Sequence, residues 1–177
     1  SHHGYVFAVS AQSGALQRAT PIVNYGRFKH EAAAVEPKTR VAYLTEDQRD
    51  SCFSRFVPNS VVDPFNGRLQ AMAVRGWPRF RTDRRLSQGD EIDIEWVNIP
   101  TPNPRRDTVR YQGQELGAAI VNRGKGLWLN EVKVYFTATE GGRRRRGQIF
   151  CLDTRYDRLR LIASGDDSPL DMPDNLT

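Results

Sequence analysis

The chain has 177 residues, with 26 lysines and arginines against 21 aspartates and glutamates, so its formal net charge is +5. Hydrophobic residues make up 38% of the sequence and charged residues 27%, which is typical of one globular domain with a sizeable core. No apolar run approaches the roughly 18 residues of a membrane-spanning helix, so no membrane span is expected.

The first half of the chain consists of short β-prone runs separated by turn residues. Four of them follow one another: EAAAVE (31–36), VAYLTED (41–47), CFSRFVP (52–58) and RLQAMAV (68–74). This order predicts a four-stranded antiparallel meander. A polar, proline-rich stretch at about 75–117 comes next. It is either an insertion around the strand-like EIDIEWVNI or a degenerate copy of the same four-stranded unit.

The second half repeats the order of the first. Its four runs are GLWL (126–129), KVYFTAT (133–139), GQIFCLD (147–153) and RLRLIAS (158–164). Phe7, Phe56 and Phe150 are expected in third strands, and their separations are 49 and 94 residues, the second close to twice the first. A four-stranded unit that recurs every 40–50 residues is typical of a β-propeller blade.

The sequence therefore predicts an all-β fold, a partial β-propeller with four-stranded antiparallel blades. Residues 1–177 are expected to form a single incomplete domain, an internal piece of a longer protein. A β-sandwich built from the same short strands is the alternative. Four consecutive arginines, 143–146, are expected in an exposed hairpin loop, and nucleic-acid binding is not expected because no reader motif accompanies them. Cys52 and Cys151 lack metal-ligand spacing and are expected to fill small apolar slots.

Acidic residues mark the ends of two neighbouring strands. Glu31 opens the first strand of the first meander, while Glu46 and Asp47 end the antiparallel second strand, so all three are expected near one face. Converging carboxylates repel one another unless a cation lies between them, and calcium takes 6–8 oxygen ligands. Each residue taken alone could instead cap a turn. Their shared register favours a metal site.

The repeat spacing adds residues from later in the chain. Adding 94 to Glu31 gives Lys125, and adding a further 49 gives Asp174, each just before a strand-like or apolar run. The side-chain carbonyl of Asn175 is a suitable additional cation ligand.

Several of these segments together resemble the PhoX-type alkaline phosphatases. The resemblance rests on RFKHEAAAVEPKTRVAYLTEDQRDSCFSRFVP, EIDIEWVNIPTPNP, RGKGLWLNEVKVYFTATEGG, GQIFCLD and LDMPDNLT, which occur in the family's order. It implies a six-bladed propeller that hydrolyses phosphate monoesters with calcium and iron. It also implies a periplasmic or extracellular location and a monomeric state when the chain is complete.

The resemblance implies roles for six residues. Arg123, in the family's RGEG motif, points at the substrate phosphate, which suits its planar fork of donors. The implied metal ligands are Glu46 and Asp47 of the TED motif, Asp174 and Asn175 of the PDN motif, and Glu31 of the HEA motif.

Two departures from the family pattern bear on activity. The RGEG motif reads RGKG here, so Lys125 replaces a ligand carboxylate. Its ammonium group either cripples the metal site or occupies the space of a cation. The family's iron-ligating cysteine segment lies outside these 177 residues, so the chain alone is expected to be inactive. A non-catalytic propeller that binds or scaffolds is the main alternative function, and a calcium-dependent lactonase or phytase ranks lower.

Overall fold

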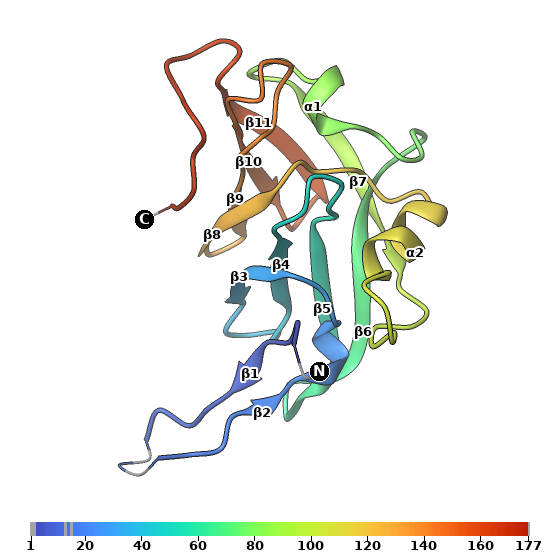
Figure 1. Ribbon diagram of the computed structural model, residues 1–177, viewed down its shortest axis with the longest axis vertical. Coiled ribbons are helices and arrows are strands. Elements are labelled where there is room, and N and C mark those ends of the chain that lie inside the picture. Colours follow the sequence, from blue (N-terminus) through green and yellow to red (C-terminus); the bar gives the residue numbers. More distant parts are fainter. Residues whose placement is uncertain (1–2, 13, 15, 177) are drawn as a thin grey trace.

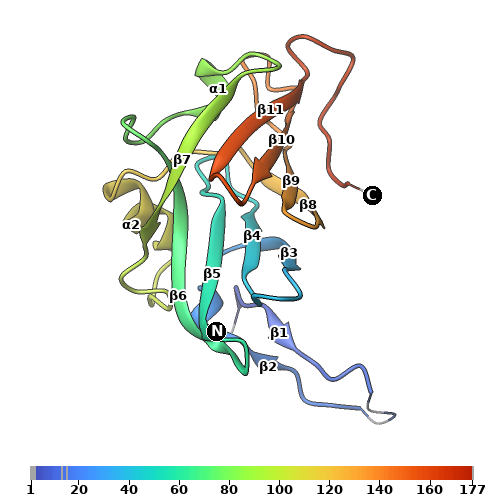
Figure 2. The same ribbon diagram turned by 180° about the vertical axis from the view of Figure 1, so that it is seen from behind.

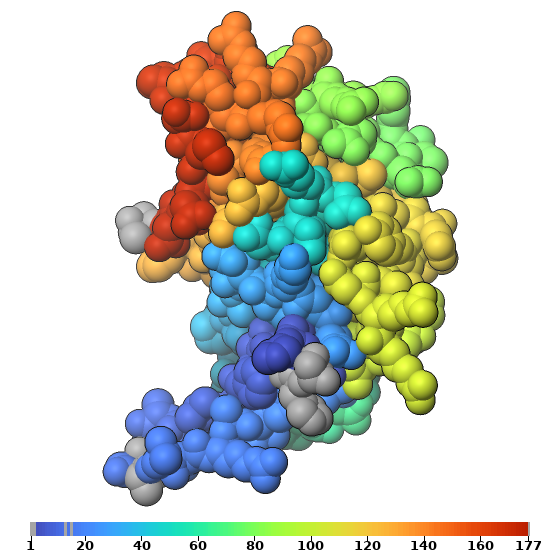
Figure 3. Space-filling view, viewed as in Figure 1, coloured from blue at the N-terminus to red at the C-terminus, as the bar shows by residue number. Residues whose placement is uncertain are grey.

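The computed structural model describes residues 3–12, 14 and 16–176, and β-strands dominate it (Figure 1). Two short strands, β1 (Phe7–Ala8) and β2 (Thr20–Pro21), pair as a hairpin that projects from one end of the molecule (Figure 3). The 3-10 helix η1 (Val23–Tyr25) leads from this hairpin towards the main sheet. Phe7 therefore lies in a separate two-stranded hairpin, unlike Phe56 and Phe150, which lie in third strands as predicted.

Both predicted meanders are confirmed. The first consists of β3 (His30–Val35), β4 (Ala42–Glu46), β5 (Ser54–Ser60) and β6 (Asp63–Val74), each antiparallel to the next. The second consists of β8 (Gly124–Asn130), β9 (Lys133–Ala138), β10 (Gln148–Asp153) and β11 (Arg158–Ser164). The alternating apolar and polar residues of these segments fit strands that have one buried face.

One further strand joins the meanders into a single sheet. Strand β7 (Glu91–Asn98), from EIDIEWVN, pairs antiparallel with both β6 and β11. The resulting nine-stranded order is β3-β4-β5-β6-β7-β11-β10-β9-β8, and Figure 2 shows β5, β6, β7 and β11 in succession. The sheet curls so that its two edge strands, β3 and β8, pack against each other. The fold is thus all-β and continuous, and it differs from the two stacked sheets of the sandwich alternative.

The rest of the segment at 75–117 forms turns and two short helices, α1 (Thr82–Arg85) and α2 (Val109–Glu115). Helix α2 covers part of the sheet beside β6. Within the described part of the chain, no helix is both long and apolar enough to cross a bilayer.

Two clusters of buried side chains hold the sheet together. In the larger one, Phe136 stacks on Phe53 with ring centroids 4.0 Å apart and on Phe150 at 5.0 Å, and all three rings are at most 1% exposed. Such stacked, fully buried rings are among the largest single contributors to core stability. The smaller cluster includes Phe56 and also Cys52, which fills an apolar slot as predicted. Burial raises the pKa of the Cys52 thiol above its ordinary value.

Candidate functional site

The two edge strands, β3 and β8, begin in the same irregular way. The register of β3 against β4 shifts between His30 and Ala33, and the register of β8 against β9 shifts between Gly124 and Leu127. These positions are 94 residues apart in both cases, so the repeat extends to the backbone irregularity itself. A β-bulge redirects the side chains beside it. Glu31 and Lys125 occupy the second position of their strands, inside these two bulges.

Thr45 of β4 ties the two bulged strands together. Its hydroxyl accepts a hydrogen bond from the Ala32 amide at 3.0 Å and donates to the Lys125 carbonyl oxygen at 2.7 Å. The residue is 1% exposed, so these bonds are shielded from water. The small Gly124 permits this close approach, because a Cβ there would lie only 3.2 Å from the Thr45 Cβ. The starts of β3 and β8 are therefore held at a fixed separation.

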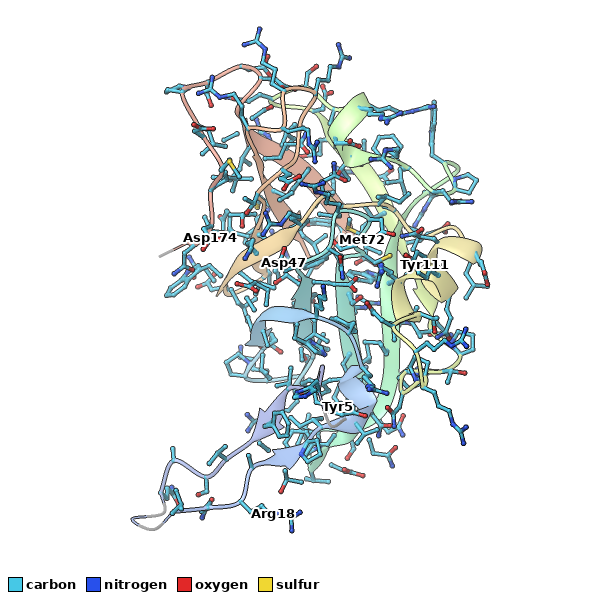
Figure 4. The ribbon with its side chains drawn as sticks, in the orientation of Figure 1. Tyr5, Arg18, Asp47, Met72, Tyr111 and Asp174 are labelled. Atoms are coloured by element: carbon cyan, nitrogen blue, oxygen red, sulfur yellow. The ribbon has the colours of Figure 1, made fainter. Side chains whose placement is uncertain are left out.

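The ammonium group of Lys125 lies among three carboxylates. Its Nζ is 3.1 Å from Asp47 Oδ2, 3.4 Å from Glu31 Oε1 and 3.5 Å from Asp174 Oδ1. Figure 4 shows Asp47 and Asp174, which are far apart in the sequence, on the same side of the molecule near β8. The Lys125 side chain is 13% exposed. The structure thus brings together three of the carboxylates that the sequence predicted, and it places an ammonium group among them.

These contacts favour the charged form of Asp47 and the charged form of Lys125. The hydrogen bond from Arg123 is the main cause that lowers the pKa of Asp47, and Lys125 lowers it further. Burial lowers the pKa of Lys125, but the hydrogen bond and charge of Asp47, with the charges of Glu31 and Asp174, outweigh that effect and raise it overall. Lys125 and Asp47 therefore form a charged ion pair at neutral pH.

Arg123 lies immediately before β8 and is fixed at its backbone and at its side chain. Its φ is 55°, a left-handed conformation that costs a non-glycine residue roughly 1–3 kcal/mol. Its amide donates to the Gln48 carbonyl at 2.9 Å, and its own carbonyl accepts from the Thr139 amide at 2.9 Å. Its guanidinium donates two hydrogen bonds to Asp47, from Nε at 2.7 Å and from Nη2 at 3.2 Å, and Nη1 donates to Glu140 at 3.1 Å.

A carboxylate that the sequence reasoning missed completes this arrangement. Glu140 follows β9, and it accepts hydrogen bonds from Arg49, Arg123 and Arg145. Burial would raise the pKa of Glu140, but the bonds from Arg145, Arg123 and Arg49 lower it overall. The internal repeat could have revealed it, because the spacing of 94 residues relates Glu140 to Glu46 at the end of β4.

Glu46 lies apart from this group. It is 2% exposed, and Arg110 of α2 donates to its Oε1 at 3.3 Å. Successive side chains on a strand point to opposite faces, so Glu46 and its neighbour Asp47 cannot both face Lys125. Arg110 also binds Asp50 and Asp107, at 2.9 Å each. Glu46 is therefore a buried side chain bound to Arg110 of α2, which corrects the expectation that it joins the other carboxylates.

Asn175 approaches the carboxylate cluster around Lys125 with its backbone and not with its side chain. Its side-chain oxygen accepts a hydrogen bond from the Leu176 amide at 2.9 Å, which is a local cap. A Cβ at position 126 would lie only 2.7 Å from the Asn175 Cα. Glycine at position 126 therefore lets the segment around Asn175 lie against β8. The Gly126 amide donates to the Asp174 carbonyl at 2.8 Å, and Thr139 donates to the Pro173 carbonyl at 2.7 Å. These bonds place Asp174 beside Lys125.

The described residues do not fit a metal ion as they stand. Among residues 3–12, 14 and 16–176, no group of three or more His, Cys, Asp or Glu side chains is arranged to hold one. The three carboxylates that converge do so on the Lys125 ammonium group, whose charge would repel a cation at that point.

The fold and the site together define an all-β protein in which paired carboxylates and guanidinium groups meet where two bulged strands begin. The sequence profile of the alkaline phosphatase PhoX family matches residues 1–177, so the chain belongs to that family. No curated protein sequence matches the chain.

A similar solved structure is that of Pseudomonas fluorescens PhoX in complex with vanadate, described as a transition state analogue. The TM-score is 0.70 at 17% sequence identity, and the match covers 99% of this chain and 41% of that chain. At this identity the likeness establishes a shared fold. The chain thus spans less than half of the length of that phosphatase.

Proposed function

We propose that the full-length protein that contains this chain hydrolyses phosphate monoesters, and that Arg123 binds and orients the phosphate group. Membership of the alkaline phosphatase PhoX family supports the reaction. The observation that carries the assignment of Arg123 is its guanidinium, which Asp47 and Glu140 hold in a fixed orientation. We also propose that the two meanders are blades of a six-bladed propeller that is completed outside these residues.

The geometry leaves Arg123 able to act on an anion. A guanidinium has five N–H donors, and the two carboxylates use three of them, which leaves one on each terminal nitrogen. Guanidinium N–H groups are well suited to binding phosphate oxygens. Lys125 and Arg123 donate to the same oxygen of Asp47, so a second positive charge lies close to the guanidinium. These charges would stabilise negative charge that shifts between phosphoryl oxygens during reaction.

The calcium and iron that the resemblance implies are proposed for the full-length protein, with ligands from outside this chain, and the role of Arg123 does not depend on them. A periplasmic or extracellular location and a monomeric state follow from the same resemblance. The 177 residues alone are proposed to be inactive, because they span 41% of the similar phosphatase.

A non-catalytic binding module is the second candidate, and the central position of Lys125 favours it. Hydrolysis of p-nitrophenyl phosphate by the full-length protein, with inorganic phosphate binding measured by calorimetry, separates the two. For a phosphatase we expect Arg123→Lys to lower kcat/KM by about 10²-fold, the usual effect of losing one oriented donor. Arg158→Lys, in an exposed pair with Asp93, should have wild-type activity. Phosphate binding without turnover would establish the binding module, and neither binding nor turnover would reject both.

A further inference from the structure

The ammonium group of Lys125 forms ion pairs with three carboxylates. An ammonium group has three N–H donors, and three carboxylate oxygens from three separate chain segments lie within 3.5 Å of Nζ. Asp47 and Glu31 come from the first meander and Asp174 from the last segment of the chain, so this arrangement depends on the tertiary fold. Three carboxylates this close to one point are mutually repulsive without a positive charge between them.

The distances distinguish an ammonium site from a calcium site. Calcium binds oxygen ligands at about 2.3–2.6 Å and requires 6–8 of them. The oxygens here lie 3.1–3.5 Å from the lysine nitrogen, which are ion-pair distances. The ammonium group occupies the centre of the cluster and offsets part of its negative charge, so an incoming divalent ion would have to displace it against repulsion.

The lysine is also held in place by its own backbone. Thr45 binds the Lys125 carbonyl, and the next residue, Gly126, binds the Asp174 carbonyl, so β8 positions both Lys125 and one of its partners. Asp47 Oδ2 receives Lys125 at 3.1 Å and Arg123 at 3.2 Å, so that oxygen already has two cationic donors. The ammonium group is thus a fixed part of the scaffold.

We propose that Lys125 is a tethered replacement for a divalent cation: it fills the Glu31–Asp47–Asp174 cluster, offsets part of its negative charge, keeps calcium out of it, and makes this part of the fold independent of bound metal. Removing its charge, with little change of size, removes the repulsion that keeps calcium away from these carboxylates. The proposal does not rest on phosphate-ester hydrolysis, because calcium binding is measured without substrate.

The test compares the number of calcium ions bound by the full-length wild-type protein and by Lys125→Met, using calorimetric titration with calcium chloride after chelation and buffer exchange. We expect Lys125→Met to bind one more calcium ion per chain, and calcium to raise its melting temperature relative to its own chelated form. Lys125→Arg keeps the charge and should show the wild-type count. The matched control is Lys133→Met, which removes an ammonium group paired with Asp153 and should leave the count unchanged.

Two results would overturn the proposal. One is a folded Lys125→Met protein with the wild-type calcium count. The other is a wild-type protein that loses one calcium ion when Asp47 is changed to Asn, since that would place calcium at this cluster beside the lysine. Should Lys125→Met fail to fold, the calcium count of Lys125→Gln replaces it. The comparison of wild type with Asp47→Asn then tests the proposal independently of any substitution at residue 125.

Discussion

Replacing Glu46 by glutamine is expected to remove a pH dependence from the stability of the fold. Burial raises the pKa of Glu46 from 4.5 to about 8, although the charge of Arg110 opposes this. The folded state therefore keeps a proton that the unfolded state releases above pH 4.5. The stability linked to this proton is fully present below pH 4.5 and is lost as pH rises towards 8.

The expected magnitude follows from that gap in pKa. Each pH unit in the window costs up to about 1.4 kcal/mol, so the whole window corresponds to a loss on the order of 5 kcal/mol. Glutamine keeps the shape of the side chain and a carbonyl oxygen for Arg110 but cannot ionise. The Glu46→Gln protein should therefore gain stability relative to the wild type as pH rises from 5 to 8.

Guanidinium unfolding followed by tryptophan fluorescence at pH 5, 6, 7, 8 and 9 measures this difference. His30, whose pKa burial lowers to about 4, contributes equally to both proteins, so the comparison isolates Glu46. The exposed Glu115 of α2 offers a control, and Glu115→Gln should follow the wild-type curve. Parallel stability curves for wild type and Glu46→Gln would refute the reasoning, because they would show that residue 46 does not change its protonation on unfolding in this range.

Three further substitutions test the packing that holds the site. Thr45→Val should cost roughly 1–3 kcal/mol in chemical denaturation, because it leaves the Ala32 amide and the Lys125 carbonyl without their partner. Phe136→Ala should cost about 3–5 kcal/mol by the same measurement, since it empties the centre of the stacked rings. Gly126→Ala should speed hydrogen exchange at the residue 126 amide, because its Cβ would meet the Asn175 backbone at 2.7 Å.

Matched substitutions at open positions serve as controls for two of these. Phe65 is 44% exposed, so Phe65→Ala should cost much less than Phe136→Ala. A Cβ at Gly14 would meet nothing within 4 Å, so Gly14→Ala should leave exchange at residue 126 unchanged. Equal costs for the two phenylalanines, or unaltered exchange in Gly126→Ala, would contradict the packing described above.

The strands were predictable because their signals are local. Alternating apolar residues and intervening turn residues define both meanders without knowledge of the rest of the chain. The repeat of 94 residues also related Glu31 to Lys125 correctly in position, since each is the second residue of its strand. Strand β7 was visible as a strand, but its two partners depend on pairing over long distances in the sequence, which no local pattern encodes.

The site was predictable only where side-chain direction did not matter. Glu46 and Asp47 are adjacent in the sequence and look equivalent as a motif, yet their side chains leave β4 in opposite directions. Burial and Arg110 then decide the role of Glu46, and both are properties of the folded chain. Glu140 lacked a motif of its own, and only its place in the second meander pointed to it.

The matching bulges at the starts of β3 and β8 suggest how such a protein can diversify. Two copies of one ancestral unit would present the same backbone at this position, with an acid in one copy and a base in the other. Exchanging glutamate for lysine leaves that backbone intact, so the electrostatic character of the junction can be inverted in a single evolutionary step without building a new scaffold.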